Sequence, residues 1–197
     1  RIPLSISNNQ FELKIESQTD VPLYLSHPIL IRNQLNIEGK DILPNIICIV
    51  IDGITHKYLS QEKTPNIFKF FDKGIFCKNV FSQGDWTLPT FSSMMTGLYP
   101  SKHGIYDPGQ FVSSLDAGFE TLPNILRNNG YRTFGYSGHF RFSPTYGHAK
   151  GFERMLYKPL TLQDYYVQEI NEAIQHLEAH RKEPNFVFLH FFDTHMP

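Results

Sequence analysis

The sequence has few of the features that crosslink a chain or anchor it in a membrane. It contains only two cysteines, Cys48 and Cys77, among 197 residues. Both lie in apolar stretches, so we predict two buried free thiols and no disulfide framework. No apolar run is long enough to cross a bilayer, and no secretory signal opens the chain. These absences favour a fold held together by its hydrophobic core, without a membrane span in this chain.

An excess of either charge is also absent. The 18 lysine and arginine residues against 19 aspartate and glutamate residues give a formal net charge of -1. This balance provides no broad basic surface, so we expect no nucleic-acid partner. Hydrophobic residues make up 41% of the chain and aromatic residues 14%, which excludes a disordered or coiled-coil chain and predicts a large, filled interior.

Two regions differ in their residue pattern. Residues 1–43 alternate apolar with polar side chains in short pieces broken by proline, which predicts a small N-terminal β appendage or lead-in. Residues 44–197 alternate strand patterns with helical patterns, which favours an α/β fold with a doubly wound, mostly parallel sheet and helices on both faces. We predict strands over 46–51 (covered on both faces), 75–81, 131–137 and 186–192, and helices that begin at Pro65, Leu88, Thr121 and Thr161. The start at Arg1 and the end after a strand-like run predict a piece of a longer protein.

Polar side chains follow three of the predicted strands. Asp52 comes directly after the strand at 46–51, His139 and Arg141 follow the strand at 131–137, and Asp193 and His195 follow the strand at 186–192. Ligands of open α/β sheets bind beyond the carboxyl ends of the strands. We therefore expect these side chains to converge at one edge of the sheet.

Asp52 and Thr87 are the strongest candidates for chemistry. A carboxylate directly after six apolar residues is costly to bury without a cation or several donors, so Asp52 is either a metal ligand or a capping residue of the following loop. Thr87 lies at the start of the predicted helix, where free N–H groups favour an anion. It is either an N-cap or a nucleophile, and a nucleophilic hydroxyl needs activation by a metal or a base.

A series of short motifs supports the chemical interpretation. In order they are Pro44-Asn45-Ile46 leading to Asp52, Thr64-Pro65-Asn66-Ile67, Thr87-x-Pro89-Thr90, Thr96-Gly97-Leu98-Tyr99-Pro100, His103-Gly104, Gly130-Tyr131-Arg132-Thr133, Gly138-His139-Phe140, Gly151-Phe152 and Asp193-Thr194-His195-x-Pro197. Their order and spacing from Pro44 to Pro197 resemble the alkaline phosphatase superfamily, in particular its sulfatase-like branch. The resemblance implies that residues 44–197 are the N-terminal part of a sulfatase-like catalytic domain.

The resemblance implies a role for individual residues. Asp52 occupies the position of a metal ligand in the family, and Thr87 occupies the position of the nucleophile, which also binds the metal. His195 falls on a histidine that contacts the ester or assists the leaving group. His139 falls where many sulfatases have a lysine that binds the anionic group, and Arg141 falls where they have a second histidine.

Three departures from the sulfatase pattern favour phosphoryl chemistry. Sulfatases need Cys or Ser at the nucleophile, where this chain has Thr87, because that residue is converted to formylglycine. They usually carry Arg four positions on, where this chain has Phe91, and a second Asp where it has Gly53. A threonine nucleophile resembles the phosphodiesterase, phosphonohydrolase-like and phosphoglycerol transferase relatives. We therefore expect a metal-dependent hydrolase or transferase of phosphate esters, while a sulfatase and a non-catalytic anion-binding protein stay open.

The expected site is incomplete within this chain. The implied cofactor is a divalent ion (Mn, Mg, Ca or Zn), and the implied partner is a small-molecule, glycan or lipid phosphate or sulfate ester. Asp52 and Thr87 are the predicted metal ligands, which are too few for a tight site. The catalytic candidates are Thr87, His195 and His139, with Arg141 and Asp193 as substrate-binding candidates; Asp193 equally fits a metal ligand or a residue that holds His195. The resemblance implies an Asp-His pair beyond this chain, so we expect the C-terminal remainder of the protein to complete the site.

Overall fold

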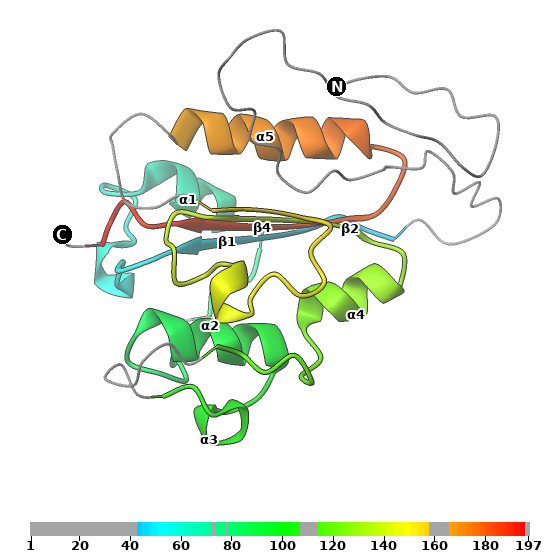
Figure 1. Ribbon diagram of the computed structural model, residues 1–197. Helices are drawn as coiled ribbons and strands as arrows, with labels where there is room; N and C mark the ends of the chain where they lie inside the picture. The colour runs from blue at the N-terminus through cyan, green and yellow to red at the C-terminus, as the bar shows by residue number, and fades with distance from the viewer. Residues whose placement is uncertain (1–42, 72–73, 78, 107–113, 158–165, 196–197) are drawn as a thin grey trace, which may run out of the picture. The chain divides into compact units, whose positions relative to one another are not determined.

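The computed structural model describes residues 43–71, 74–77, 79–106, 114–157 and 166–195 (Figure 1). The predicted N-terminal appendage, apart from Leu43, lies outside these residues, as does the start of the helix predicted from Thr161.

One parallel sheet forms the centre of the described structure. Its strand order is β1-β4-β2-β3, and all three neighbouring pairs run parallel. The strands are β1 (Ile46–Ile51), β2 (Arg132–Ser137), β3 (Arg154–Tyr157) and β4 (Asn185–Phe191). The predicted strands at 46–51, 131–137 and 186–192 are confirmed. The four-residue β3 was not predicted, because so short a run carries little periodicity.

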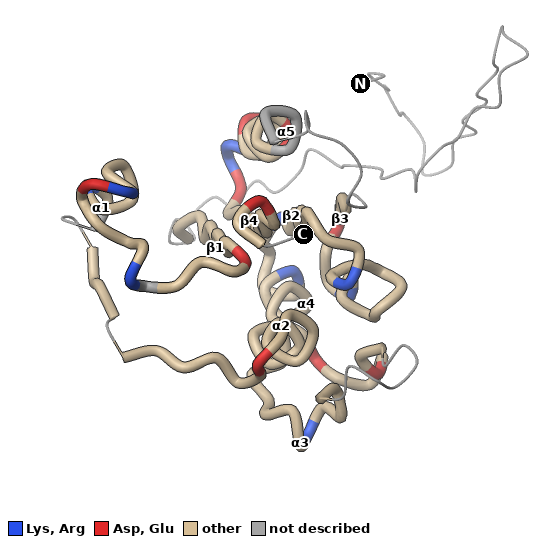
Figure 2. The backbone as a smooth tube through the Cα atoms, turned by 90° about the vertical axis from the view of Figure 1, so that its left-hand side faces the viewer, with Lys and Arg blue, Asp and Glu red and all other residues tan. Residues whose placement is uncertain are grey.

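Helices cover both faces of this sheet, as predicted (Figures 1 and 2). Helix α5 (Tyr166–Ala179) lies on one face, and α2 (Thr87–Thr96) and α4 (Leu122–Asn128) lie on the other. The remaining helices are α1 (Pro65–Phe71), α3 (Pro100–His103) and the 3-10 turns η1 (His56–Tyr58) and η2 (Pro144–Tyr146). None of the helices in the described ranges has the length and apolarity needed to cross a membrane.

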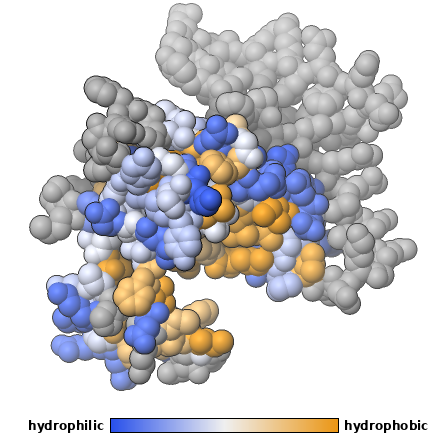
Figure 3. Space-filling view, turned by 90° about the horizontal axis from the view of Figure 1, so that it is seen from below, coloured by the Kyte–Doolittle hydropathy of each residue, from blue (hydrophilic) through white to orange (hydrophobic). Residues whose placement is uncertain are grey.

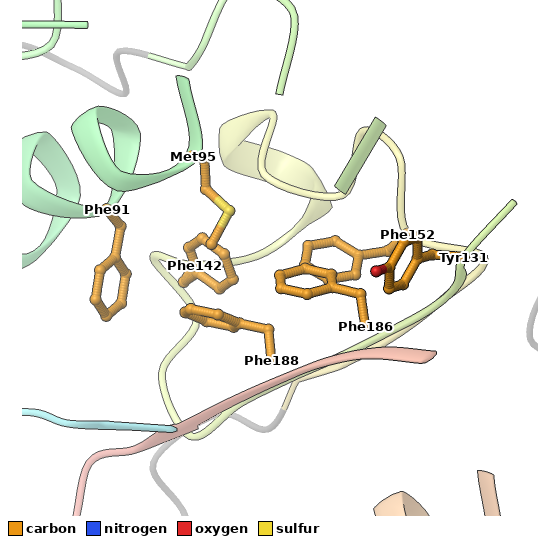
Figure 4. Close-up of a cluster of buried hydrophobic side chains, with 7 residues drawn as sticks. All are labelled: Phe91, Met95, Tyr131, Phe142, Phe152, Phe186 and Phe188. Carbon is orange, nitrogen blue, oxygen red and sulfur yellow. The ribbon is translucent and has the colours of Figure 1, made fainter. Parts of the chain in front are cut away.

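The two faces of β4 bury two separate hydrophobic clusters. Phe186 and Phe188 join a mainly aromatic cluster with Phe91 and Met95 of α2 (Figure 4), and Leu126 of α4 packs against the same cluster. Val187 and Leu189 belong to the cluster on the opposite face, which includes Ala173 of α5. Successive residues of a strand alternate between faces, so the continuous apolar run of β4 is explained by burial on both sides. The alternation also places His190 on the face that α2 covers.

The edge strand β1 is less buried than predicted. Its residues Ile47 and Ile49 are 52% and 59% exposed, so the expected cover on both faces is wrong for the described residues. Cys48 and Val50 pack against the aromatic cluster, so alternation puts Ile47 and Ile49 on the opposite face of this edge strand, where they stay open to solvent. Exposed apolar surface is visible in the view from below (Figure 3).

The strand predicted over 75–81 is wrong, since none of its described residues lies in a strand. Ile75 and Phe81 are 90% and 82% exposed, and Cys77 is exposed rather than buried. A run of apolar residues forms a strand only where another strand pairs with its backbone, and no described strand does so here. Cys48 in β1 is half-buried, and burial raises the pKa of its thiol.

Candidate active site

The carboxyl ends of three adjacent strands place polar side chains on one face of the sheet. The register pairs Val50 of β1 with His190 of β4, and His190 with Ser137 of β2. Asp52 lies two residues beyond Val50 and therefore on the same face. Its backbone N–H donates to the carbonyl of Phe191 at 2.9 Å, which continues the ladder past the end of β1. The sheet thus fixes where Asp52 lies.

Thr87 approaches Asp52 from the helix that covers this face. It is the first residue of α2, and its hydroxyl donates a hydrogen bond to Oδ2 of Asp52 at 3.1 Å. Phe91, one turn further along, packs edge-on against His190 with ring centroids 4.6 Å apart. Residues four apart share one face of a helix, so this contact aims Thr87 at the strand ends. The N-cap alternative for Thr87 is wrong, because Trp86 occupies that position.

His190 and Ser137 belong to this cluster, although the sequence analysis did not single them out. Nε2 of His190 lies 3.3 Å from Oδ2 of Asp52, and its Nδ1 lies 2.9 Å from Oγ of Ser137. Both residues are 0% exposed. A signal was present in the sequence: His190 is the one polar residue in the apolar run 186–192.

Asp52 is ionised at neutral pH. Burial acts to raise the pKa of its carboxyl, but hydrogen bonds from His190 and Thr87 and the electrostatic influence of His190 and His195 outweigh burial, so the pKa lies below its usual value. A carboxylate only accepts, so Nε2 of His190 and Oγ1 of Thr87 both donate to it. Both bonds fall on Oδ2, and Oδ1 accepts none from the described residues.

His139 is buried in the loop after β2 with a defined tautomer. Its Nδ1 accepts the backbone N–H of Arg141 at 3.2 Å, and its ring stacks on Phe192 at a centroid distance of 4.3 Å. Burial, with smaller contributions from Arg141 and other nearby residues, lowers the pKa of His139 to about 4. The ring is therefore neutral at pH 7 and carries its hydrogen on Nε2. His139 can donate a hydrogen bond to an anion but does not supply the positive charge of the lysine it replaces.

The loop after β4 lies against Asp52 and Gly53. Gly53 has a φ of +75°, and a Cβ there would lie 3.1 Å from the Thr194 carbonyl oxygen, so only glycine suits this close approach. The Thr194 hydroxyl donates to the Asp52 carbonyl oxygen. This contact brings His195, which stacks on Phe192 at 4.2 Å, to the same edge as His139.

The two substrate-binding candidates differ in their surroundings. The guanidinium carbon of Arg141 lies 5.4 Å from the centroid of the Trp86 ring, which places this exposed side chain beside the residue that precedes Thr87. Asp193 is exposed in the turn after β4 and makes no hydrogen bond within the described part of the chain. The structure therefore brings Arg141 beside the start of α2, while Asp193 has no hydrogen-bond partner among the described residues.

The donor set at Asp52 fits part of a site for a hard divalent cation. Oδ2 of Asp52 and Oγ1 of Thr87 are 3.1 Å apart. Oδ1 of Asp52 accepts no hydrogen bond from the described residues and is open to a cation, and carboxylate and hydroxyl oxygens are ligands that a hard divalent ion prefers. The described residues include no group of three or more His, Cys, Asp or Glu side chains placed to hold a metal. Asp52 and Thr87 can therefore supply two ligands, while other residues must complete the site.

The fold and the site define an α/β protein with polar groups beyond the carboxyl ends of a parallel sheet. The sequence model of the sulfatase family matches residues 44–197, and the chain belongs to that family. The resemblance predicted from the motifs is confirmed.

Named relatives include both phosphodiesterases and sulfatases. The chain is 33% identical over 90 residues to ectonucleotide pyrophosphatase/phosphodiesterase family member 3 of Mus musculus, which is 44% of this chain and 10% of that protein. It is 26% identical over 93 residues to iduronate 2-sulfatase of Mus musculus, which is 45% of this chain and 17% of that protein. The matched part of the chain thus spans only a small share of these relatives.

Solved structures share the fold. Lipoteichoic acid synthase LtaP from Listeria monocytogenes superposes with a TM-score of 0.62 at 17% identity, over 86% of this chain and 45% of that chain. A protein solved in complex with its substrate, D-glucosamine-2-N,6-O-disulfate, has a TM-score of 0.60 at 23% identity, over 75% of this chain and 34% of that chain. At these identities the likeness shows the fold alone.

Proposed function

We propose that this protein is a metal-dependent hydrolase or transferase of phosphate esters with Thr87 as its nucleophile. The hydrogen bond of 3.1 Å from Thr87 Oγ1 to Asp52 Oδ2 carries the proposal, because it joins a hydroxyl at a helix N-terminus to an ionised carboxylate. The family and the named relatives are ester hydrolases, and they include phosphodiesterases. These observations support an ester-cleaving enzyme.

The residue types support phosphoryl over sulfuryl transfer. Thr87 stands where a sulfatase requires Cys or Ser for conversion to formylglycine. Phe91 stands where such enzymes usually have Arg, and it is 3% exposed within the aromatic core cluster. A buried phenyl ring cannot contact a charged intermediate, so this position serves packing here.

Asp52 and Thr87 would hold the divalent ion, which when bound stabilises negative charge on the threonine oxygen and on the phosphoryl group. In the proposed reaction, Oγ1 of Thr87 forms a bond to phosphorus while the bond from phosphorus to the leaving oxygen breaks. The hydroxyl proton is directed along its hydrogen bond toward Oδ2 of Asp52. Water or an acceptor alcohol then attacks phosphorus and releases the threonine oxygen.

Other groups of the chain would bind the phosphoryl oxygens. The first turn of α2 leaves the N–H groups of Thr87 and Leu88 without intrahelical partners, while Pro89 has no N–H. Nε2–H of His139 and the guanidinium of Arg141 would add donors as charge develops. His195 is exposed at the same edge and would donate a proton to the leaving oxygen.

The test is to assay the intact protein with Mn²⁺ on p-nitrophenyl phosphate, bis(p-nitrophenyl) phosphate and p-nitrophenyl sulfate. We expect turnover of a phosphate ester, a loss of roughly 10³-fold or more in kcat for Thr87→Ala, and partial activity for Thr87→Ser, with melting temperatures unchanged. Turnover of the sulfate alone would favour a sulfatase. Undiminished activity of Thr87→Ala would reject the nucleophile, and a wild-type protein without turnover of any ester would favour an anion-binding protein.

A further inference from the structure

A continuous line of hydrogen bonds crosses three strands and ends at the proposed nucleophile. Oγ of Ser137 lies 2.9 Å from Nδ1 of His190, and Nε2 of His190 lies 3.3 Å from Oδ2 of Asp52. The same Oδ2 accepts the hydroxyl of Thr87 at 3.1 Å. Paired positions on β2 and β4 put Ser137 and His190 at one level of the sheet, so the backbone ladder itself sets their separation. We call Ser137, His190 and Asp52 the row.

The middle of the row has little freedom to move. Oγ of Ser137 also accepts the backbone N–H of His139 at 3.1 Å and lies 2.9 Å from the His139 carbonyl oxygen, so its one hydroxyl hydrogen goes either to that oxygen or to Nδ1 of His190. Phe91 closes one side of the His190 ring with a nearly perpendicular contact, at an interplanar angle of 87°. Both ring nitrogens of His190 are engaged, and the ring is fully buried. A fixed imidazole N–H therefore points at Asp52.

Two other buried histidines, His148 and His176, lack such an arrangement. His148 is 2% exposed and stacks on Phe142, yet both of its ring nitrogens have no hydrogen-bond partner among the described residues. His176 packs against Phe134, and its Nε2 has no partner in the same part of the chain. Burial of a histidine in this core is thus possible without a bonded row.

We propose that His190, held by Ser137, is a positioning residue that fixes the rotamer of Asp52 so that Oδ2 faces Thr87 and Oδ1 remains available to a cation. The effect on catalysis rests on the proposed function, whereas the effect on Asp52 does not. Partners that orient a metal ligand in this way usually contribute about 10- to 100-fold to metal affinity or activity. Asp52 has no other side-chain donor among the described residues besides His190 and Thr87.

The first experiment needs neither metal nor substrate. Nitrogen-15 NMR of the histidine rings in the intact protein reports the hydrogen bonds of each ring nitrogen. We expect Asp52→Asn to shift the Nε2 resonance of His190 and Ser137→Ala to shift its Nδ1 resonance, while the resonances of His176 stay in place. If neither substitution moves the His190 resonances, the row does not exist and the proposal is overturned.

The second experiment measures Mn²⁺ affinity by calorimetry in folded variants. His190→Leu should weaken binding about 10- to 100-fold, and His190→Gln should recover part of the loss, because its amide N–H can reach Oδ2. Ser137→Ala should weaken binding by a smaller factor and add nothing in the His190→Leu background, since Ser137 acts only through His190. His176→Leu is the matched control, a buried histidine replaced far from Asp52, and should bind Mn²⁺ as the wild type does.

The outcomes distinguish a failure of the positioning role of His190 from a failure of the proposed function. Equal Mn²⁺ affinity in His190→Leu and wild type, or additive losses in the double variant, would contradict the positioning role. In turnover assays we expect the variants that lose most Mn²⁺ affinity to lose most kcat, with His190→Leu the most affected, while KM changes little. A wild-type protein without Mn²⁺ binding or turnover would refute the proposed function. The NMR comparison would then still test whether His190 is hydrogen-bonded to Asp52 and Ser137.

Discussion

The two ends of the sheet use buried polar side chains in opposite ways. At the amino end, Arg132 forms ion pairs with Glu183 and, at 3.1 Å, with Glu153. The Asn185 amide donates to the carbonyls of His180 and Glu183 at 3.1 and 2.7 Å. Positive and negative side chains meet there, so the charges of this network compensate one another.

At the carboxyl end, the charges do not meet their opposites. Asp52 accepts only from a hydroxyl and an imidazole, and its Oδ1 accepts nothing from the described residues. Arg141 is exposed and rests on aromatic rings rather than on a carboxylate. The comparison teaches that a polar cluster which balances its own charges stabilises the fold, whereas one that leaves a carboxylate and a guanidinium uncompensated is suited to bind a cation and an anionic ester.

The largest expected contrast comes from removing one carboxylate at each end. Asp52→Asn should lower kcat by roughly 10³-fold or more, because the proposed cation and the Thr87 hydroxyl both lose their charged partner. Glu183→Gln should lower the free energy of unfolding by about 3 kcal/mol, because it leaves Arg132 without one of its buried partners, and the folded fraction should keep its activity. Urea unfolding and phosphate-ester turnover measure both. An Asp52→Asn protein with normal turnover, or an inactive but stable Glu183→Gln protein, would break the comparison.

A smaller effect is a loss of stability in acid that both ends share. Burial, as the main cause, lowers the pKa values of His139, His148 and His176 to about 4. In the unfolded chain these values lie near 6.5, so below that pH the unfolded state binds more protons. Their contribution to stability is complete above about pH 6.5 and is lost as the pH falls toward 4, by up to roughly 1.4 kcal/mol per pH unit for each histidine.

Urea unfolding at pH 7.5, 6.0 and 5.0 checks this dependence. The slope of the unfolding free energy against pH reports the protons taken up on unfolding. His139→Gln and His176→Gln should each lower this uptake by about one proton, although the two residues lie at opposite ends of the sheet. Only His139→Gln should also reduce turnover. Equal slopes in the wild type and in both variants would show that neither histidine is held neutral in the folded protein.

The smallest effect is expected for exposed arginines. Arg141→Ala should raise KM for an anionic ester about tenfold with little change in melting temperature, since its guanidinium faces solvent beside Trp86. Arg127→Ala is the matched control at the other end, where an exposed guanidinium lies 4.0 Å from Glu153, and should change stability by less than about 0.5 kcal/mol and KM not at all. A tenfold change in KM for both variants would indicate a general effect of surface charge.

Much of the candidate site could be predicted from local sequence. A carboxylate after an apolar strand and a hydroxyl before Pro89 in a helical pattern are short-range signals, and the structure brings Asp52 and Thr87 together. His190 was missed because a single polar residue in a buried run does not reveal which neighbour it meets. The strand at 75–81 was mispredicted because strand formation depends on a partner that local pattern does not specify.

The sequence by itself determined the alternation of strands and helices, the turn at Gly53 and the residue types at the strand ends, because these depend on residue spacing and backbone conformation within a few positions. Only the tertiary structure decided the order β1-β4-β2-β3, in which β4, the last strand in sequence, lies between β1 and β2. That order inserts His190 between Asp52 and Ser137. It follows from packing between distant segments, whose free energy cannot be read from any local pattern.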